Sequence, residues 1–338
     1  MHDPVLVVLV ILVALSFDFT NGFHDTANAI ATSVSTRALS PRMAIVLSAV
    51  MNFVGAFVTL KVAATIGSGV IDPSKYDVTL VLIMSALIGA IAWNLVTWWR
   101  GLPSSSSHAL IGGLIGAGVV KLGLGAVSWN TVLEKMILPL VVSPILGFVL
   151  AYIGMLIIYW VFRDARPRPL NRGFRLAQIL SSAFIAFSHG TNDAQKTMGI
   201  IALALVSGQT LTAADVKAGH IPLWVVAAAA VAMALGTYAG GWRIIRTMGT
   251  RLYKIEPAQG FDAQTIAATL IQGASHFGLP VSTTHVVSGS ILGAGSSQSM
   301  SAVRWGVGLN IFLAWIITLP MAALFAAIIY FVLHFIRP

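Results

Sequence analysis

The chain contains no cysteine and very little charge. Only 9% of its 338 residues are Asp, Glu, Lys or Arg, against about 25% in a typical soluble domain. The absence of cysteine excludes disulfides and thiol chemistry, although it leaves the redox compartment open. The shortage of charge goes with 57% hydrophobic residues and a mean hydropathy of +0.88. This composition is typical of a polytopic membrane protein, and the apolar runs leave no room for a large soluble domain.

Acidic residues are scarcer than basic ones, so the formal net charge is +9. An excess of this kind can indicate nucleic-acid binding. Here, however, the basic residues lie in short loops between apolar segments, which indicates the positive-inside rule of membrane proteins. We therefore expect the lipid bilayer as a partner and no nucleic acid.

Two short polar phrases each occur twice in this apolar background. Gly22-Phe-His-Asp-Thr-Ala-Asn28 is echoed by Gly190-Thr-Asn-Asp-Ala-Gln-Lys196, and Leu102-Pro-Ser-Ser-Ser-Ser-His108 by Leu279-Pro-Val-Ser-Thr-Thr-His285. The members of each pair are about half the chain length apart. Ionisable residues at a bilayer centre cost roughly 2.5 to 3.5 kcal/mol each, so duplicated polar phrases indicate a transporter made of two repeats.

We therefore predict an all-α membrane protein of two inverted repeats, with broken transmembrane helices and re-entrant helical hairpins. The predicted repeats are residues 1–162 and 176–338, joined by a basic cytoplasmic linker at 163–175. If the Leu-Pro segments return to the side they enter from, each half crosses three times and the second half is inverted. Charge counts then favour both termini outside a cell (inner) membrane, in a multi-pass arrangement. Full crossings in place of the hairpins remain the alternative.

The first duplicated phrase supplies candidate ligands for a coupling ion. We expect Asn21-Gly22 and His189-Gly190 to interrupt their helices and to expose backbone groups. Asp25 and Asp193 occupy matching positions, and either Na⁺ or H⁺ could bind there, so the two would be metal ligands only if the ion is Na⁺. The coupling-ion candidates are Asp25, Asn28, Asn192, Asp193, His24 and His189.

Two further charged residues lie close to these acids in the sequence. Lys196 follows Asp193 by three residues, which permits an ion pair on one helix face, with direct contact to an anion as the alternative. Asp18 precedes Asp25 by two helical turns. It is either part of an access path or a satisfied residue near the outer interface.

The second phrase predicts an anion site. Ser and Thr are favoured helix N-caps, so each hydroxyl run should open a helix with free amides and a positive dipole end. Inversion would bring the two tips together at the midplane, with His108 and His285 orienting the hydroxyls; simple capping of two hairpins is the alternative. The predicted substrate-binding residues are Ser105, Ser106, Ser107, Ser282, Thr283, Thr284, Asn28 and Gln195.

These phrases resemble the signatures of the PiT family of inorganic phosphate transporters, and the similarity covers nearly the whole chain. The family pattern looks like Gly-Ala-Asn-Asp-x-Ala-Asn-Ala and Gly-x-Asn-Asp-Ala-Gln-Lys, with Leu-Pro-Ser-Ser-Ser-His and Leu-Pro-Val-Ser-Thr-Thr-His. The resemblance implies symport of phosphate with H⁺ or Na⁺ by alternating access, in a homodimer that is not an enzyme and has no cofactor. It places Asp25, Asn28, Asn192 and Asp193 at ion and substrate sites, and the two hydroxyl runs at the phosphate.

The chain departs from this pattern at Phe23-His24, where the family usually has Ala-Asn. A titratable ring in place of an amide oxygen favours H⁺ over Na⁺. A sulfate permease of the same family remains an alternative, as does a passive anion channel. An intramembrane hydrolase using Ser107 and His108 is disfavoured, because sequence neighbours point in different directions on a helix.

Overall fold

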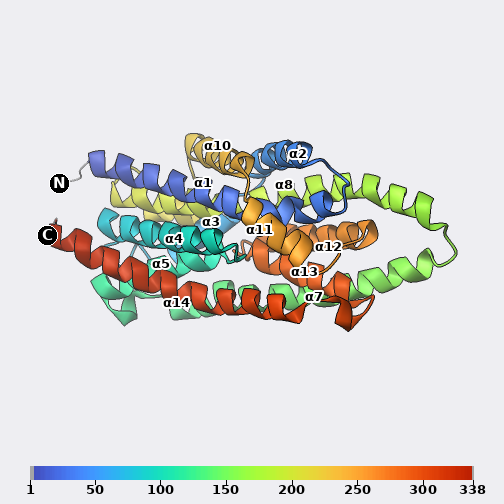
Figure 1. The fold of residues 1–338 in the computed structure, drawn as a ribbon. Coiled ribbons are helices and arrows are strands. Elements are labelled where there is room, and N and C mark those ends of the chain that lie inside the picture. Colours follow the sequence, from blue (N-terminus) through green and yellow to red (C-terminus); the bar gives the residue numbers. More distant parts are fainter. Residues whose placement is uncertain (1–3, 337–338) are drawn as a thin grey trace.

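The computed structural model describes residues 4–336, which form a long helical bundle (Figure 1). The all-α prediction is confirmed. The first half contains α1 (Pro4–Ser35), α2 (Pro41–Gly55), α3 (Lys61–Gly69), α4 (Leu80–Arg100), α5 (Ser106–Leu122), α6 (Trp129–Thr131) and α7 (Leu138–Val161). The second half contains α8 (Pro167–Ser207), α9 (Ala213–Ala218), α10 (Leu223–Ala239), α11 (Trp242–Arg246), α12 (Pro257–His276), α13 (Thr283–Ser296) and α14 (Trp305–Ile336).

The two halves repeat one order of elements. Each opens with a long helix (α1 or α8), continues through a pair of shorter helices (α2–α3 or α10–α11) and a helical hairpin (α4–α5 or α12–α13), and closes with another long helix (α7 or α14). Figure 1 shows α4–α5 in the part of the molecule where α1 begins, and α12–α13 in the part near the α7–α8 connection. The hairpin tips therefore approach each other from opposite ends.

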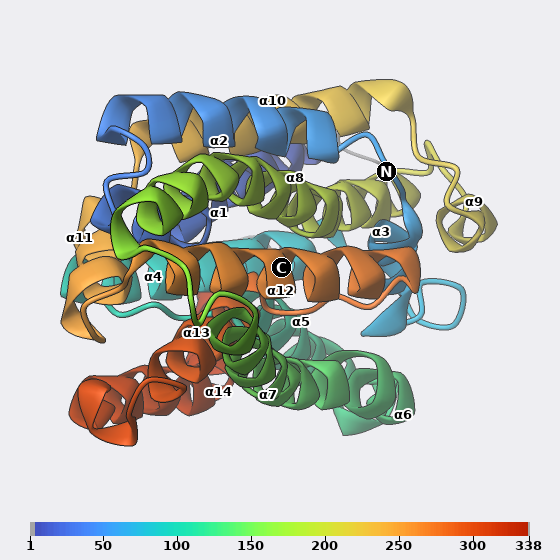
Figure 2. The same ribbon diagram turned by 90° about the vertical axis from the view of Figure 1, so that its right-hand side faces the viewer.

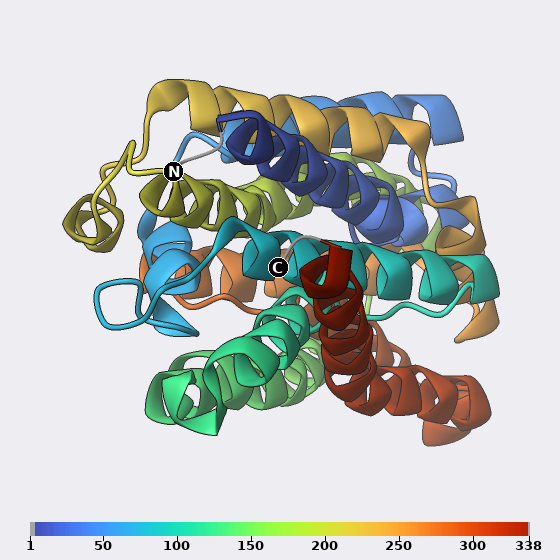
Figure 3. The same ribbon diagram turned by 90° about the vertical axis from the view of Figure 1, so that its left-hand side faces the viewer.

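The bundle is layered when it is seen along its long axis. Figures 2 and 3 show α2 and α10 on one face, α7 and α14 crossing on the opposite face, and the hairpins with α1 and α8 between them. Within residues 4–336, four helices are long and apolar enough to cross a bilayer, and the bent α10–α11 pair is a possible fifth. The outer faces of α7 and α14 expose large apolar side chains, as lipid-facing helices do.

The predicted breaks at Asn21-Gly22 and His189-Gly190 are wrong, because α1 and α8 run through these positions without interruption. The glycines serve close helix packing. A Cβ on Gly22 would lie 2.5 Å from the carbonyl oxygen of Met233 on α10, and one on Gly190 would lie 2.7 Å from Cα of Asn52 on α2. The polar groups at this depth are therefore side chains on intact helices.

The bend in the bundle lies elsewhere. The axes of α10 and of the helical segment from Trp242 to Arg251 differ by 59°. The chain turns at Gly240, whose φ of +74° is a conformation that glycine adopts without steric cost. The predicted linker at 163–175 is also shorter than expected as a loop, because its residues from Pro167 onward belong to α8.

Candidate ion and anion site

The two hairpin tips meet near the middle of the bundle. Ser105 caps α5 by accepting a hydrogen bond from His108 N at 3.2 Å, and Ser282 caps α13 by accepting one from His285 N at 3.3 Å. Ser107 Oγ on the first tip donates to Val281 O on the second at 3.2 Å. The structure thus brings the two tips into direct contact, and all seven hydroxyl residues of the two runs, Ser104 to Ser107 and Ser282 to Thr284, are buried.

The first-turn amides of both helices point toward this junction. Ser106 and Ser107 begin α5, and Thr283 and Thr284 begin α13. The backbone N–H groups at such positions have no acceptor within their own helix. The hydroxyl of Ser106 is buried and has no hydrogen-bond partner in the described chain. Free donors at two converging positive helix ends are suited to an anion.

Asp25 on α1 and Asp193 on α8 meet around His189. His189 Nε2 lies 3.9 Å from Asp25 Oδ2 and 3.6 Å from Asp193 Oδ2. Each residue can offer one ligand atom within 4.8 Å of the others, and all three are buried. The two predicted acids therefore form one cluster that could hold a cation.

Each acid already has a basic partner on its other oxygen. His24 Nδ1 lies 2.8 Å from Asp25 Oδ1. Lys196 Nζ donates to Asp193 Oδ1 at 2.7 Å, which confirms the predicted ion pair. Burial weakens screening by water, so both pairs interact more strongly than they would at a surface.

Hydrogen bonds join the acid cluster to the tips. Thr284 Oγ1 donates to Asp25 Oδ1 at 3.2 Å, and Asn28 Nδ2 donates to Thr284 Oγ1 at 2.9 Å. Lys196 Nζ also donates to Ser107 Oγ at 2.5 Å. Any ion that changes the charge of either acid therefore changes the hydrogen bonds of the tip hydroxyls.

Two other predicted residues hold the surrounding helices. Asn192 Nδ2 donates to Ser275 Oγ at 2.9 Å and to Leu279 O at 3.2 Å, so it fastens the second hairpin to α8. Gln195 Oε1 accepts hydrogen bonds from Val62 N at 2.9 Å and Ala63 N at 3.2 Å, at the start of α3. The structure does not bring the Gln195 amide into contact with the tips.

The expected role of His108 and His285 is wrong. Their contacts to the capping serines come from backbone N–H groups, while their rings pack on each other with centroids 4.7 Å apart. His285 also stacks on Trp315 at 3.9 Å. The imidazoles therefore face away from the hydroxyls.

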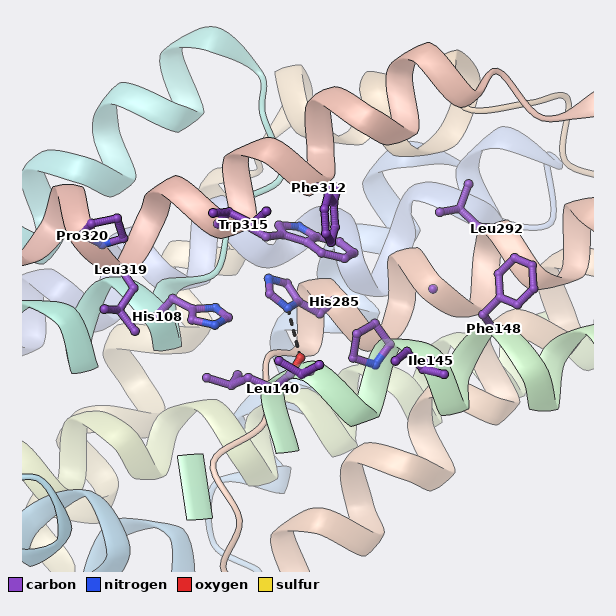
Figure 4. A pocket seen from close by; sticks show the side chains of 14 residues that line it. His108, Leu140, Ile145, Phe148, His285, Leu292, Phe312, Trp315, Leu319 and Pro320 are labelled. Atoms are coloured by element: carbon purple, nitrogen blue, oxygen red, sulfur yellow. Dashed lines mark hydrogen bonds between the residues drawn. The ribbon is translucent and has the colours of Figure 1, made fainter. Parts of the chain in front are cut away.

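These two histidines contribute to an apolar cavity of about 610 Å³ between α7 and α14. Figure 4 shows its lining, which includes Leu140, Phe148 and Phe312. Such a lining suits hydrocarbon and offers a phosphate ion almost no donors. The cavity is therefore separate in chemistry from the polar cluster at the tips.

Sequence reasoning missed several residues that complete the polar cluster. Thr97 Oγ1 and Ser104 Oγ lie 3.2 Å and 3.3 Å from His24 Nε2, and Asn52 Oδ1 lies 3.0 Å from His189 Nδ1. Thr97 and Asn52 are single polar residues within apolar runs. Their only signal was that isolation, whereas Ser104 stood inside a predicted hydroxyl run.

Comparison with known proteins identifies the family. The model of the phosphate transporter family matches residues 21–172 and again residues 163–326. This chain belongs to the phosphate transporter family. The predicted PiT membership is thereby confirmed, and the double match agrees with the two repeats seen in the fold.

Several similar proteins carry transporter names. A probable low-affinity inorganic phosphate transporter of Mycobacterium tuberculosis is 50% identical over 332 residues, covering 98% of this chain and 78% of that protein. One of Bacillus subtilis is 49% identical and covers 98% of both chains. Since family and relatives are transporters, the prediction that the chain is not an enzyme is confirmed.

A solved structure is also similar. It is described as the sodium-dependent phosphate transporter, has 26% sequence identity and a TM-score of 0.88, and the match covers 98% of this chain and 100% of that one. The predicted fold class of an all-α membrane protein is therefore confirmed by an independent structure.

Proposed function

We propose that this family member is a secondary active transporter that moves inorganic phosphate together with a cation by alternating access. One observation carries the proposal: a single buried network joins the acids Asp25 and Asp193 to the tip residues Thr284 and Ser107. A cation at the acids and an anion at the tips would share these groups. Binding of one would then favour binding of the other, with a coupling of about 1 to 3 kcal/mol.

Phosphate fits this network better than sulfate does. At neutral pH phosphate still carries a proton that it can donate, and a carboxylate of Asp25 or Asp193 beside the tips can accept it. Sulfate has no such proton and would face the carboxylates without compensation. The names of the relatives support the same choice. Ser105, Ser106, Ser107, Ser282, Thr283 and Thr284 would surround the anion, with Asn28 orienting Thr284.

We propose H⁺ as the coupling ion. His24 already contacts one oxygen of Asp25, and Lys196 contacts one oxygen of Asp193. A Na⁺ ion in this cluster would therefore have to bind beside the Lys196 ammonium group. A proton, in contrast, can bind directly to the His24–Asp25 pair. The similar solved structure belongs to a transporter described as sodium-dependent, which favours the opposite choice. The usual family residue at the position of His24 is Asn, and we propose that this difference would change the coupling ion.

Lys196 would help the transporter to release its substrate. Its ammonium donates to Asp193 Oδ1, Ser107 Oγ and Val281 O, the last at 3.0 Å, so its three protons are already used. An arriving anion must share it with these acceptors. Affinity would therefore stay moderate, which an alternating-access cycle needs on its releasing side.

The proposed setting is a cell inner membrane, with both termini outside and a homodimeric assembly. The basic segment between α7 and α8 lies at the end of the bundle opposite the start of α1, as inverted repeats at 1–162 and 176–338 require (Figure 1). Arginines of this segment, such as Arg163 and Arg172, would then face the cytoplasm.

Uptake into proteoliposomes tests the proposal. Labelled phosphate should accumulate inside the liposomes above its equilibrium level when the outside is made more acidic than the inside. A Na⁺ gradient alone should drive much less accumulation. Excess unlabelled sulfate should compete poorly. Phosphate uptake that stops at the equilibrium concentration would indicate a passive channel. Accumulation driven by a Na⁺ gradient alone would show that Na⁺, and not H⁺, is the coupling ion.

Two variants assign the roles of the residues. Asp193→Asn should abolish uptake while the purified protein keeps its helical content. His24→Asn restores the amide of the usual family pattern. The change in uptake rate between acidic and neutral pH should therefore be at least tenfold smaller than in the wild type. Unchanged pH dependence in His24→Asn would remove His24 from the coupling path.

A further inference from the structure

A second group of buried polar residues lies next to the acid cluster and is not explained by it. Asp18 and Asn21 on α1, Asn94 on α4 and Thr197 on α8 are all fully buried. None of their side-chain oxygens, and neither amide nitrogen, has a hydrogen-bond partner among residues 4–336. Buried polar groups without partners are costly and rare, so the four residues together are a candidate ligand site.

Helix geometry brings the four side chains to one place. His24 on α1 contacts Thr97 on α4 at 3.2 Å, and Asn21 and Asn94 each lie three residues earlier on these helices. Both helices begin at the same end of the bundle, where Ser207 is hydrogen-bonded to Val78 O and Gly208 packs against Val7. One turn back along parallel helices therefore sets Asn21 opposite Asn94.

The third helix closes the same space. Asp18 precedes Asp25 by seven residues, so it points to nearly the same side of α1, toward α8. There Thr197 interacts with the Asp18 carboxylate without reaching hydrogen-bond geometry. Asp193 and Lys196, which precede Thr197 on α8, are paired with each other. Within the described residues the Asp18 carboxyl group thus has no hydrogen-bond partner.

We infer that Asp18, Asn21, Asn94 and Thr197 form a binding site for Na⁺, separate from the Asp25–His189–Asp193 cluster. The donors are one carboxylate, two amide oxygens and one hydroxyl, which are the ligands of a hard cation. A single carboxylate balances a single positive charge. Binding here needs no transport step, so the site does not depend on H⁺ or Na⁺ being the ion that drives phosphate.

The test measures thermal unfolding of the purified protein in detergent without phosphate. Na⁺ is varied at constant pH and ionic strength, with choline as the replacement cation. A ligand that binds only the folded state raises the unfolding midpoint with concentration. The wild type should show this rise, and Asp18→Asn, which keeps the shape but removes the charge, should abolish it. Asp25→Asn, which alters the other cluster, should keep it.

Thr197→Val and Asn94→Ala provide further variants if Asp18→Asn fails to fold. Each removes one ligand, so each should raise the Na⁺ concentration for half the effect at least fivefold. Three outcomes overturn the inference. The first is an unchanged Na⁺ response of the unfolding midpoint in Asp18→Asn, and the second is an unchanged half-effect Na⁺ concentration in both ligand variants. The third is a wild-type midpoint that does not change with Na⁺ but changes with pH in a way that Asp18→Asn removes. None of them bears on phosphate uptake.

Discussion

Lys196 on α8 donates a hydrogen bond to Ser107 on the tip of α5, with 2.5 Å between Nζ and Oγ. The same ammonium donates to Asp193 at 2.7 Å and to the backbone of the second tip at Val281. One charged group therefore connects an acid of the Asp25–His189–Asp193 cluster with both helix starts of the proposed anion site.

Removing this ammonium should destabilise the protein strongly. Lys196→Met would leave Asp193 buried without its partner, and breaking a buried pair costs about 3 to 5 kcal/mol. Chemical unfolding in detergent measures the loss. Lys217→Met is a matched control, because its pair with Asp72 lies at the surface and should contribute about 1 kcal/mol or less. A loss no larger than that of the control would contradict the importance of the buried pair. The double variant Asp193→Asn with Lys196→Met should recover part of the stability.

The tip hydroxyls should control the apparent affinity for phosphate. Ser107→Ala and Thr284→Ala each remove a donor beside the anion, and one such hydrogen bond is about 0.5 to 1.5 kcal/mol, or up to about tenfold in KM. Initial rates of phosphate uptake measure the change. Ser288→Ala serves as the control, since this buried hydroxyl on α13 has no hydrogen-bond partner in the described structure. Equal changes in all three variants would argue against a specific anion site at the tips.

Gly190→Ala should separate α8 from α2. The added Cβ would lie 2.7 Å from Cα of Asn52, so the backbones must move apart, at a cost of about 1 to 3 kcal/mol. Thermal unfolding reports the loss as a lower midpoint. Gly273→Ala on α12 is the matched control, because a Cβ there has no atom within 4 Å. It should be neutral or slightly stabilising. A Gly190→Ala protein as stable as this control would show that the helices do not need the close approach.

An ion pair at the surface should add a small acid-dependent term to stability. Partial burial opposes ionisation of Asp72, but hydrogen bonds from Ser74 and the Lys217 ammonium outweigh it and lower the Asp72 pKa from 3.8 to about 2. Because the folded-state pKa is the lower one, the contribution is complete above about pH 4 and is lost as the pH falls toward 2. Unfolding midpoints measured through this range should fall less steeply in Asp72→Asn. An unchanged slope would exclude the pair as a source of acid sensitivity.

The amino-acid sequence by itself determined the class of the protein and the positions of its polar phrases. Low charge and long apolar runs require a membrane environment, and the Ser and Thr runs cap α5 and α13 because helix capping is a local interaction. The Asp193–Lys196 pair was also predictable, since residues three apart share a helix face.

Only the tertiary structure decided which polar groups meet. Gly22 and Gly190 read as helix breaks, yet whether a glycine interrupts a helix or admits a neighbour depends on the helix packed against it. The meeting of Asp25, His189 and Asp193, and the contact of His24 with Thr97, join residues far apart in the chain. Such contacts follow from how α1, α4 and α8 pack together, and no periodicity within one helix specifies the partner of a side chain on another.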